Sequence, residues 1–161
     1  MTQASKRSGE AGHVLSVRVY YEDTDAAGIV YYANYLHFAE RARTELLRSL
    51  GFARTDRTHG VAFAVRSCAV DYLAPARLDD WLDIETQLVN LQGASLEVAQ
   101  TIRRDGKTLV HLTVRMACMD GDGKVTRMPT ELREALKAGL SRSPFKVGAS
   151  KVHTSKTRRS A

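Results

Sequence analysis

The sequence predicts an α+β domain in which an antiparallel sheet packs against one long helix. Three observations support this prediction: one long amphipathic segment near the N-terminus, four strand-like segments after it, and short turns between those strands. Helices and strands that occur in separate runs are typical of α+β folds, whereas doubly wound parallel sheets need the two to alternate. At 161 residues, the chain has the length of one domain.

The first predicted elements are a strand, a loop and a helix. Residues 13–23 alternate between apolar and polar side chains, as in a half-buried strand. Residues 23–34 form a predicted loop, and Asn34 is a suitable N-cap for the helix that follows. Apolar residues then recur every three or four positions up to Leu50, which predicts an amphipathic helix of about 16 residues. Gly51 can end this helix in the left-handed conformation.

The rest of the domain is predicted to be strands, with a short helix at its end. Asp105-Gly106 has the composition of a tight hairpin turn between two of these strands. Residues 129–136 predict the closing helix. The predicted strands cover residues 61–72, 81–91, 95–104 and 107–119.

Charge divides the chain into three parts. The net charge is +6, but residues 1–13 carry +1 and residues 137–161 carry +7, so the central part carries −2. We therefore expect a flexible segment over residues 1–13, a folded domain over 14–136, and a basic disordered tail over 137–161. Because the positive charge lies in the tails and not in the domain, we expect no nucleic-acid partner.

Several classes of protein and site are disfavoured by missing signals. The first 13 residues contain no apolar run, and no segment has the roughly 20 apolar residues that span a bilayer, so we expect a cytoplasmic protein without a transmembrane helix. Cys68 and Cys118 lie far apart and the histidines are scattered, so we expect no metal site. Dinucleotide, Walker and nucleophile-elbow motifs are absent, and we expect no cofactor.

The segment from Tyr21 to Tyr35 combines acidic residues with a predicted helix start. Three acids occur within four residues, and the glycine-containing turn AAGIVYYAN leads into the helix. Backbone N–H groups at a helix N-terminus are free to stabilise negative charge. A carboxylate with such donors nearby is suited to acyl transfer. On this pattern alone, turn and cap roles for Asp23 and Asp25 are the better explanation, because acidic loops before capped helices are common.

The same residues carry a family resemblance. EDTDAAGIVYYANY and the helical ERARTE resemble the 4-hydroxybenzoyl-CoA thioesterase family of hot-dog folds, and more narrowly its bacterial subfamily associated with the Tol-Pal system (YbgC type). The resemblance continues through DYLAPARLDD and GASL, and covers roughly residues 14–136. It implies a sheet wrapped around one long helix, and hydrolysis of acyl-CoA thioesters.

The resemblance also implies roles for particular residues. Asp25 matches the catalytic aspartate, which acts as nucleophile or as general base. Tyr32 matches the position whose backbone N–H polarises the thioester carbonyl, although many members of the subfamily have histidine there. Asn34 is interpreted as cap and site support, and Glu40 either as a second carboxylate or as an exposed helix charge. Gly93 and Ser95 match a region that contacts coenzyme A.

The expected ligands and partners follow from the same resemblance. They are acyl-CoA, or alternatively an acylated carrier protein, and further copies of this chain in a homodimer or homotetramer whose site lies between subunits. Two other functions stay open at this point: an acyl-thioester hydratase, and a non-enzymatic binding or scaffold protein in envelope or lipid metabolism.

Overall fold

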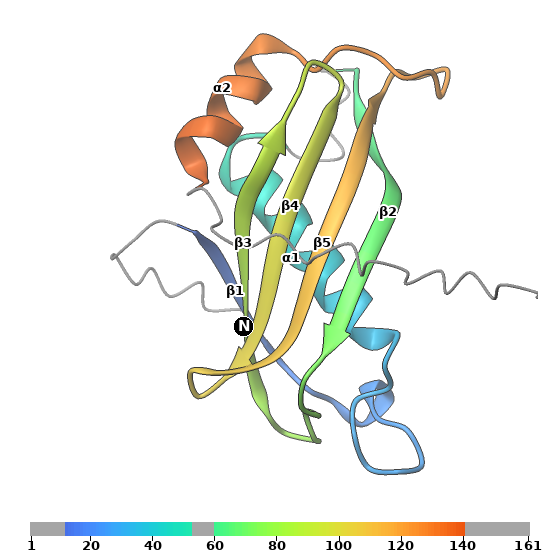
Figure 1. Ribbon diagram of the computed structural model, residues 1–161, viewed down its shortest axis with the longest axis vertical. Coiled ribbons are helices and arrows are strands. Elements are labelled where there is room, and N and C mark those ends of the chain that lie inside the picture. The colour runs from blue at the N-terminus through green and yellow to red at the C-terminus, as the bar shows by residue number, and fades with distance from the viewer. Residues whose placement is uncertain (1–11, 53–59, 141–161) are drawn as a thin grey trace, which may run out of the picture.

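The computed structural model describes residues 12–52 and 60–140. Figure 1 shows a single sheet with one long helix behind it and a shorter helix at its upper end. The described elements are β1 (His13–Arg18), the 3₁₀ turn η1 (Tyr21–Asp23), α1 (Asn34–Ser49), β2 (Ala62–Tyr72), β3 (Trp81–Leu91), β4 (Ser95–Arg104), β5 (Lys107–Met119) and α2 (Thr130–Gly139).

The sheet is antiparallel throughout. Its strand order is β1-β3-β4-β5-β2, so β1 and β2 are the two edges. The bounds of β3, β4 and β5 are those predicted from the strand-like segments and the turns between them, and β2 begins one residue later than predicted. Asp105 and Gly106 both have positive φ in the turn between β4 and β5, as this type of hairpin requires. The predicted α+β fold is confirmed.

The first strand is shorter than predicted. It ends at Arg18 and not at residue 23. The cause is Asp23, whose Oδ2 accepts a hydrogen bond of 2.8 Å from the Tyr20 N–H. This contact bends residues 21–23 into a 3₁₀ turn, because the Tyr20 N–H no longer points toward a neighbouring strand.

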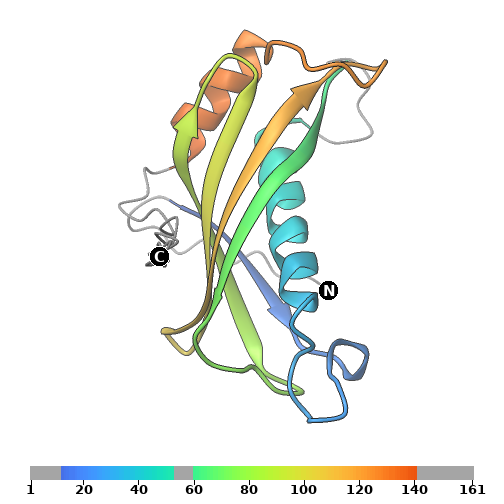
Figure 2. The same ribbon diagram turned by 45° about the vertical axis from the view of Figure 1, so that its right-hand side comes forward.

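Helix α1 lies along one face of the sheet (Figures 1 and 2), where it contacts β1 and β3. Its buried side chains are Tyr35, Phe38, Ala39, Ala42 and Leu46, at the spacing of one helical face. The two alanines have small side chains, which lets the helix backbone approach the sheet closely. The helix ends at Ser49, and the predicted terminator Gly51 follows it with φ +85° and an N–H that donates to the Arg48 carbonyl at 3.0 Å.

A buried glutamine joins α1 to the middle of the sheet. The Gln100 Nε2 donates to the Ala39 carbonyl at 2.9 Å and to the Thr86 Oγ1 at 3.0 Å. The Gln100 Oε1 accepts from the Arg43 Nη1 at 2.7 Å. Burying these groups without partners would cost free energy, so the satisfied network favours one position of the helix on the sheet.

Helix α2 covers the upper end of the core. Leu132 and Leu136 are buried, and so is Leu140 directly after the helix. The helix runs three residues past its predicted end at Leu136. The predicted flexible N-terminal segment and basic tail largely lie outside the described residues. Neither described helix is long and apolar enough to cross a membrane.

Candidate active site

The loop between β1 and α1 is a compact turn closed by its own backbone. Thr24 and Val30 form an isolated antiparallel bridge. Inside it, the Asp25 N–H donates to the Ile29 carbonyl at 2.9 Å, and the Gly28 N–H donates to the Asp25 carbonyl at 3.0 Å. Gly28 has φ +76°, a conformation that side-chain-bearing residues rarely adopt. The turn therefore presents Asp25 in one defined backbone conformation.

The Asp25 carboxylate lies at the surface of the single chain. Its Oδ1 accepts a hydrogen bond of 2.9 Å from the Ala27 N–H, which orients the side chain within the turn. The residue is exposed, as are Ala26, Ala27 and Gly28. A carboxylate held by one backbone donor and open to solvent is available to a ligand or to a second chain.

Asp23 has a different position from Asp25, although only one residue separates them. Its side chain is 5% exposed. Besides the Tyr20 N–H, it accepts the Asn34 Nδ2 at 2.9 Å through Oδ1, and its carbonyl accepts the Tyr31 N–H at 2.9 Å. Asp23 thus ties both ends of the loop together, and it is a structural residue that the sequence pattern did not distinguish from its neighbours.

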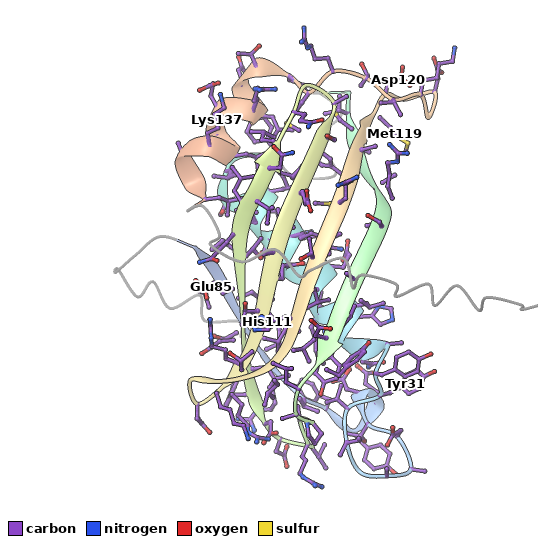
Figure 3. The ribbon with its side chains drawn as sticks, viewed as in Figure 1. Tyr31, Glu85, His111, Met119, Asp120 and Lys137 are labelled. Carbon is purple, nitrogen blue, oxygen red and sulfur yellow. The ribbon has the colours of Figure 1, made fainter. Side chains whose placement is uncertain are left out.

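Tyr32 lies just before the first turn of α1. Its carbonyl accepts a hydrogen bond of 3.0 Å from the Tyr72 hydroxyl, which links the loop to the end of β2. Among the described residues, none accepts a hydrogen bond from the Tyr32 N–H. The Tyr32 ring is 61% exposed and meets the Tyr31 ring edge-on, with centroids 4.9 Å apart. The hydrogen bond with Tyr32 raises the pKa of Tyr31, whose side chain points outward in Figure 3.

Asn34 supports the loop, but the interpretation of Asn34 as the N-cap is wrong. The cap position belongs to Ala33, and no side chain there bonds to the helix N-terminus. Asn34 is instead the first helical residue, and its side-chain amide donates to Asp23. The buried Asp23 carboxylate attracts this amide away from the backbone N–H groups that a cap would satisfy.

Glu40 lies further along α1, six residues or about 9 Å from Asn34 along the helix axis. It is half-buried, so it is not simply an exposed helix charge. Its Oε1 accepts the Thr44 Oγ1 at 3.2 Å. Arg43, which the sequence pattern did not single out, lies next to Glu40. Burial lowers the pKa of Arg43, and the Glu40 carboxylate opposes that shift.

Glu40, Arg43 and Thr44 line one wall of a cavity of about 230 Å³. The cavity lies between the second half of α1, the first half of β2 and helix α2. Most of its other lining side chains are apolar. No local sequence pattern predicts such a cavity, because its residues come from five separate elements.

Gly93 and Ser95 lie at the opposite end of the sheet from Asp25 in the single chain. The β3–β4 turn that holds them is at the top of Figure 1, whereas the loop before α1 is at the bottom. The Gly93 carbonyl accepts the Met128 N–H at 2.7 Å, and the Ser95 Oγ donates to the Gln92 Oε1 at 3.4 Å. A side chain at Gly93 would meet the Arg127 guanidinium, with Nε 3.3 Å from the added Cβ.

The structure therefore brings some predicted site residues together and separates others. Asp25 and Tyr32 belong to the loop that leads into α1, and Asn34 begins the helix. Glu40 lies about two turns further along α1, while the turn with Gly93 and Ser95 lies at the other end of the sheet. The described residues contain no group of three or more His, Cys, Asp or Glu side chains that could hold a metal ion.

Comparison with known proteins gives the same classification along most of the chain. Residues 19–136 match the thioesterase-like superfamily. The acyl-CoA thioesterase YbgC of Haemophilus influenzae is 45% identical over 127 residues, which are 77% of this chain and 93% of that relative. The long-chain acyl-CoA thioesterase FadM of Escherichia coli is 32% identical over 108 residues, which are 65% of this chain and 82% of that relative.

Solved structures have the same fold. A probable thioesterase from Bartonella henselae is 39% identical with a TM-score of 0.71, and the match covers 74% of this chain and all of that one. These similarities confirm the predicted hot-dog fold and the predicted enzyme class, a thioesterase. The chain belongs to the thioesterase-like superfamily.

Proposed function

We propose that this chain hydrolyses acyl-CoA thioesters and that Asp25 is the catalytic carboxylate. The observation that carries the proposal is the placement of Asp25: a carboxylate exposed on a closed turn that leads into the N-terminus of α1. The two curated relatives described above act on acyl-CoA. An exposed carboxylate next to backbone donors is the arrangement that acyl transfer requires.

Asp25 has two possible chemical roles. As nucleophile, its oxygen attacks the thioester carbon, the CoA thiolate leaves, and water hydrolyses the mixed anhydride to release the acid and restore the carboxylate. As general base, it takes a proton from water while the water oxygen attacks the same carbon, and the thiolate leaves. In both routes the Tyr32 N–H would donate to the oxygen that gains negative charge, since no described residue competes for it.

We propose that the active form is at least a homodimer. No described strand pairs with the outer edge of β2, and the exposed residues of this strand include Val65, Tyr72 and the adjoining Leu73. Pairing of two β2 edges about a two-fold axis would run the strands antiparallel. That pairing would bring the Asp25 loop of one chain toward Glu40 of the other chain and toward its turn with Gly93 and Ser95.

The remaining roles follow from this arrangement. Asn34 would support the catalytic loop through Asp23, Glu40 would lie near the bound acyl group, and the turn containing Gly93 and Ser95 would contact the coenzyme A moiety. An acylated carrier protein remains an alternative donor. A cytoplasmic location, a homotetramer and association with the Tol-Pal system stay predictions.

The test is release of free thiol from a panel of acyl-CoA thioesters, together with the mass of the protein by light scattering at the assay concentration. We expect thiol release and a dimer or larger assembly. Loss of the conjugated double bond of an enoyl-CoA without thiol release would indicate a hydratase. Binding of acyl-CoA without any turnover would favour the non-enzymatic interpretation.

A further inference from the structure

The cavity between α1, β2 and α2 has an apolar floor and one wall with polar residues. Its floor includes Leu132 and Leu136 of α2, and Val98 of β4, all of which are almost completely buried. Its polar residues, Glu40, Arg43 and Thr44, come from α1 alone. The charged groups of the cavity therefore lie on the wall that α1 forms, and the floor that α2 and β4 form is hydrocarbon.

We propose that this cavity binds the acyl chain of the substrate and selects a straight aliphatic chain of medium length. This inference rests on the proposed acyl-CoA hydrolysis and adds the substrate class. Three properties of the cavity support it: its volume, the chemistry of its floor, and the position of its exposed rim.

The volume determines the expected chain length. An engineered apolar cavity of about 150 Å³ in another protein binds benzene, so apolar space of this size can hold a ligand. The cavity here measures about 230 Å³. At roughly 30 Å³ for each group the size of a water molecule or a methylene, it holds about seven or eight carbon-sized groups.

The chemistry of the floor excludes polar acyl groups. A ring hydroxyl pushed to the leucines of α2 would lose its hydrogen bonds to water without gaining a partner there, which costs free energy. The polar lining residues Glu40, Arg43 and Thr44 all belong to α1, so the floor itself offers a hydroxyl no side-chain partner. Hydroxylated aromatic acyl groups are therefore disfavoured, and an unsubstituted alkyl chain is favoured.

The exposed rim lies where the proposed dimer would place the catalytic loop. Ala62 and Val65 of β2 line the cavity and are exposed, Val65 to 53%. They belong to the strand edge that would face the second chain. A thioester at this rim could place its alkyl chain in the cavity while its carbonyl meets Asp25 of the other chain.

The first experiment measures kcat/KM for straight-chain acyl-CoA thioesters from acetyl to dodecanoyl, and for 4-hydroxybenzoyl-CoA. We expect an increase of roughly fourfold for each methylene that becomes buried, a maximum at about six to eight carbons, and poor use of the hydroxylated ring. A flat profile from butyryl to decanoyl, or a preference for the aromatic thioester, would overturn the proposal.

The second experiment changes the cavity in both directions. Val98→Phe fills it, and should lower the ratio of octanoyl to butyryl kcat/KM roughly tenfold or more, since about two methylenes lose their place. Leu136→Ala enlarges it, and should move the maximum toward longer chains. Val14→Phe is the matched control, because Val14 is exposed on β1 and outside the cavity; its profile should equal that of the unmodified chain.

A binding measurement separates this proposal from the proposed activity. Calorimetry with S-octyl-CoA, a thioether that cannot be hydrolysed, should show binding that Val98→Phe weakens and Val14→Phe does not. If the chain binds S-octyl-CoA in this way but releases no thiol from any acyl-CoA, the acyl site stands and the hydrolytic function fails. If the two variants bind equally, the cavity is not the acyl site.

Discussion

The two ends of helix α1 differ in chemistry and in how they are held. At the N-terminal end, an exposed carboxylate lies on a turn held by the buried Asp23 and by tyrosine contacts. In the C-terminal half, the same helix lines an apolar cavity closed by leucines of α2. One chain thus has an exposed carboxylate and an apolar cavity at different places along one rigid element, and the proposed dimer would combine the carboxylate of one chain with the cavity of the other.

The largest expected effect concerns the carboxylate end. Asp25→Asn keeps the size of the side chain but removes the charge that attack or water activation requires. We expect kcat to fall by at least roughly a hundredfold, because a positioned base contributes about 10² to 10⁴ in rate. Asp122→Asn, at an exposed turn at the other end of the sheet, is the matched control. Steady-state thiol release with both variants measures the difference, and near-normal turnover by Asp25→Asn would remove Asp25 from the mechanism.

The next prediction asks whether the two ends act within one chain or between chains. Asp25→Asn and Val98→Phe chains carrying different affinity tags are co-expressed and purified through both tags. In a shared-site dimer, one of two sites has an intact carboxylate and an intact cavity, so octanoyl-CoA hydrolysis should return to about half the unmodified rate.

If each chain instead contained a whole site, both sites of that mixed dimer would be damaged. The mixed dimer would then be no more active than the average of the two parent variants. The same purification of an Asp25→Asn chain with a second Asp25→Asn chain gives the background rate.

A smaller effect is expected from the residue that holds the carboxylate loop. In Asp23→Asn, an amide N–H₂ replaces one of two accepting oxygens, so either the Tyr20 N–H or the Asn34 amide loses its partner. Leaving a buried donor unsatisfied costs about 1 to 3 kcal/mol. Chemical denaturation should show this loss, and kcat should fall with it, while the preference for acyl-chain length should not move. Asp122→Asn again serves as the surface control.

The smallest effect concerns an ion pair at the carboxylate end. The Arg77 N–H donates to the Asp80 Oδ2 at 2.8 Å, and the Arg104 Nη1 lies 2.6 Å from the same oxygen. Burial opposes ionisation of Asp80, but these two donors outweigh it and hold the pKa of Asp80 below its ordinary value. The stabilisation is therefore complete above pH about 4 and is lost as the pH falls through the lower folded-state pKa.

Asp80→Asn should accordingly lower the free energy of unfolding by about 1 kcal/mol at neutral pH. The difference from the unmodified chain should shrink in acid, once both proteins carry a neutral side chain there. Urea denaturation at a series of pH values measures it. A difference that persists unchanged at low pH would assign the effect to packing and not to charge.

The sequence was sufficient for β3, β4 and β5 because their signals are local. Strand-like composition between short turns predicted the three strands, and a turn dipeptide predicted the hairpin between the last two. The predicted end of the first strand and the predicted helix cap were both wrong because of one residue, Asp23. Its carboxylate accepts hydrogen bonds from the Tyr20 N–H and from the Asn34 amide. A buried carboxylate that competes for two local donors cannot be recognised from composition, since its neighbour Asp25 has the same side chain and is exposed.

The site could be predicted only in part for a related reason. Residues within the loop before α1 are close in sequence, and the structure brings them together as expected. The turn with Gly93 and Ser95 is separated from that loop by the length of the sheet, and only the tertiary arrangement shows it. The cavity depends on side chains from α1, α2 and three strands, and no periodicity within one segment encodes such a meeting.

The Gln100 network has a consequence for how chain length would be measured. Because its side-chain bonds to the Ala39 carbonyl and to Arg43 fix α1 on the sheet at its midpoint, the helix cannot slide along its axis without breaking them. The position of α1 relative to the leucines of α2, and with it the depth of the cavity, is then a constant of the fold. In the proposed dimer this depth would set the acyl-chain length at which the cavity is full, whichever chain supplies the carboxylate.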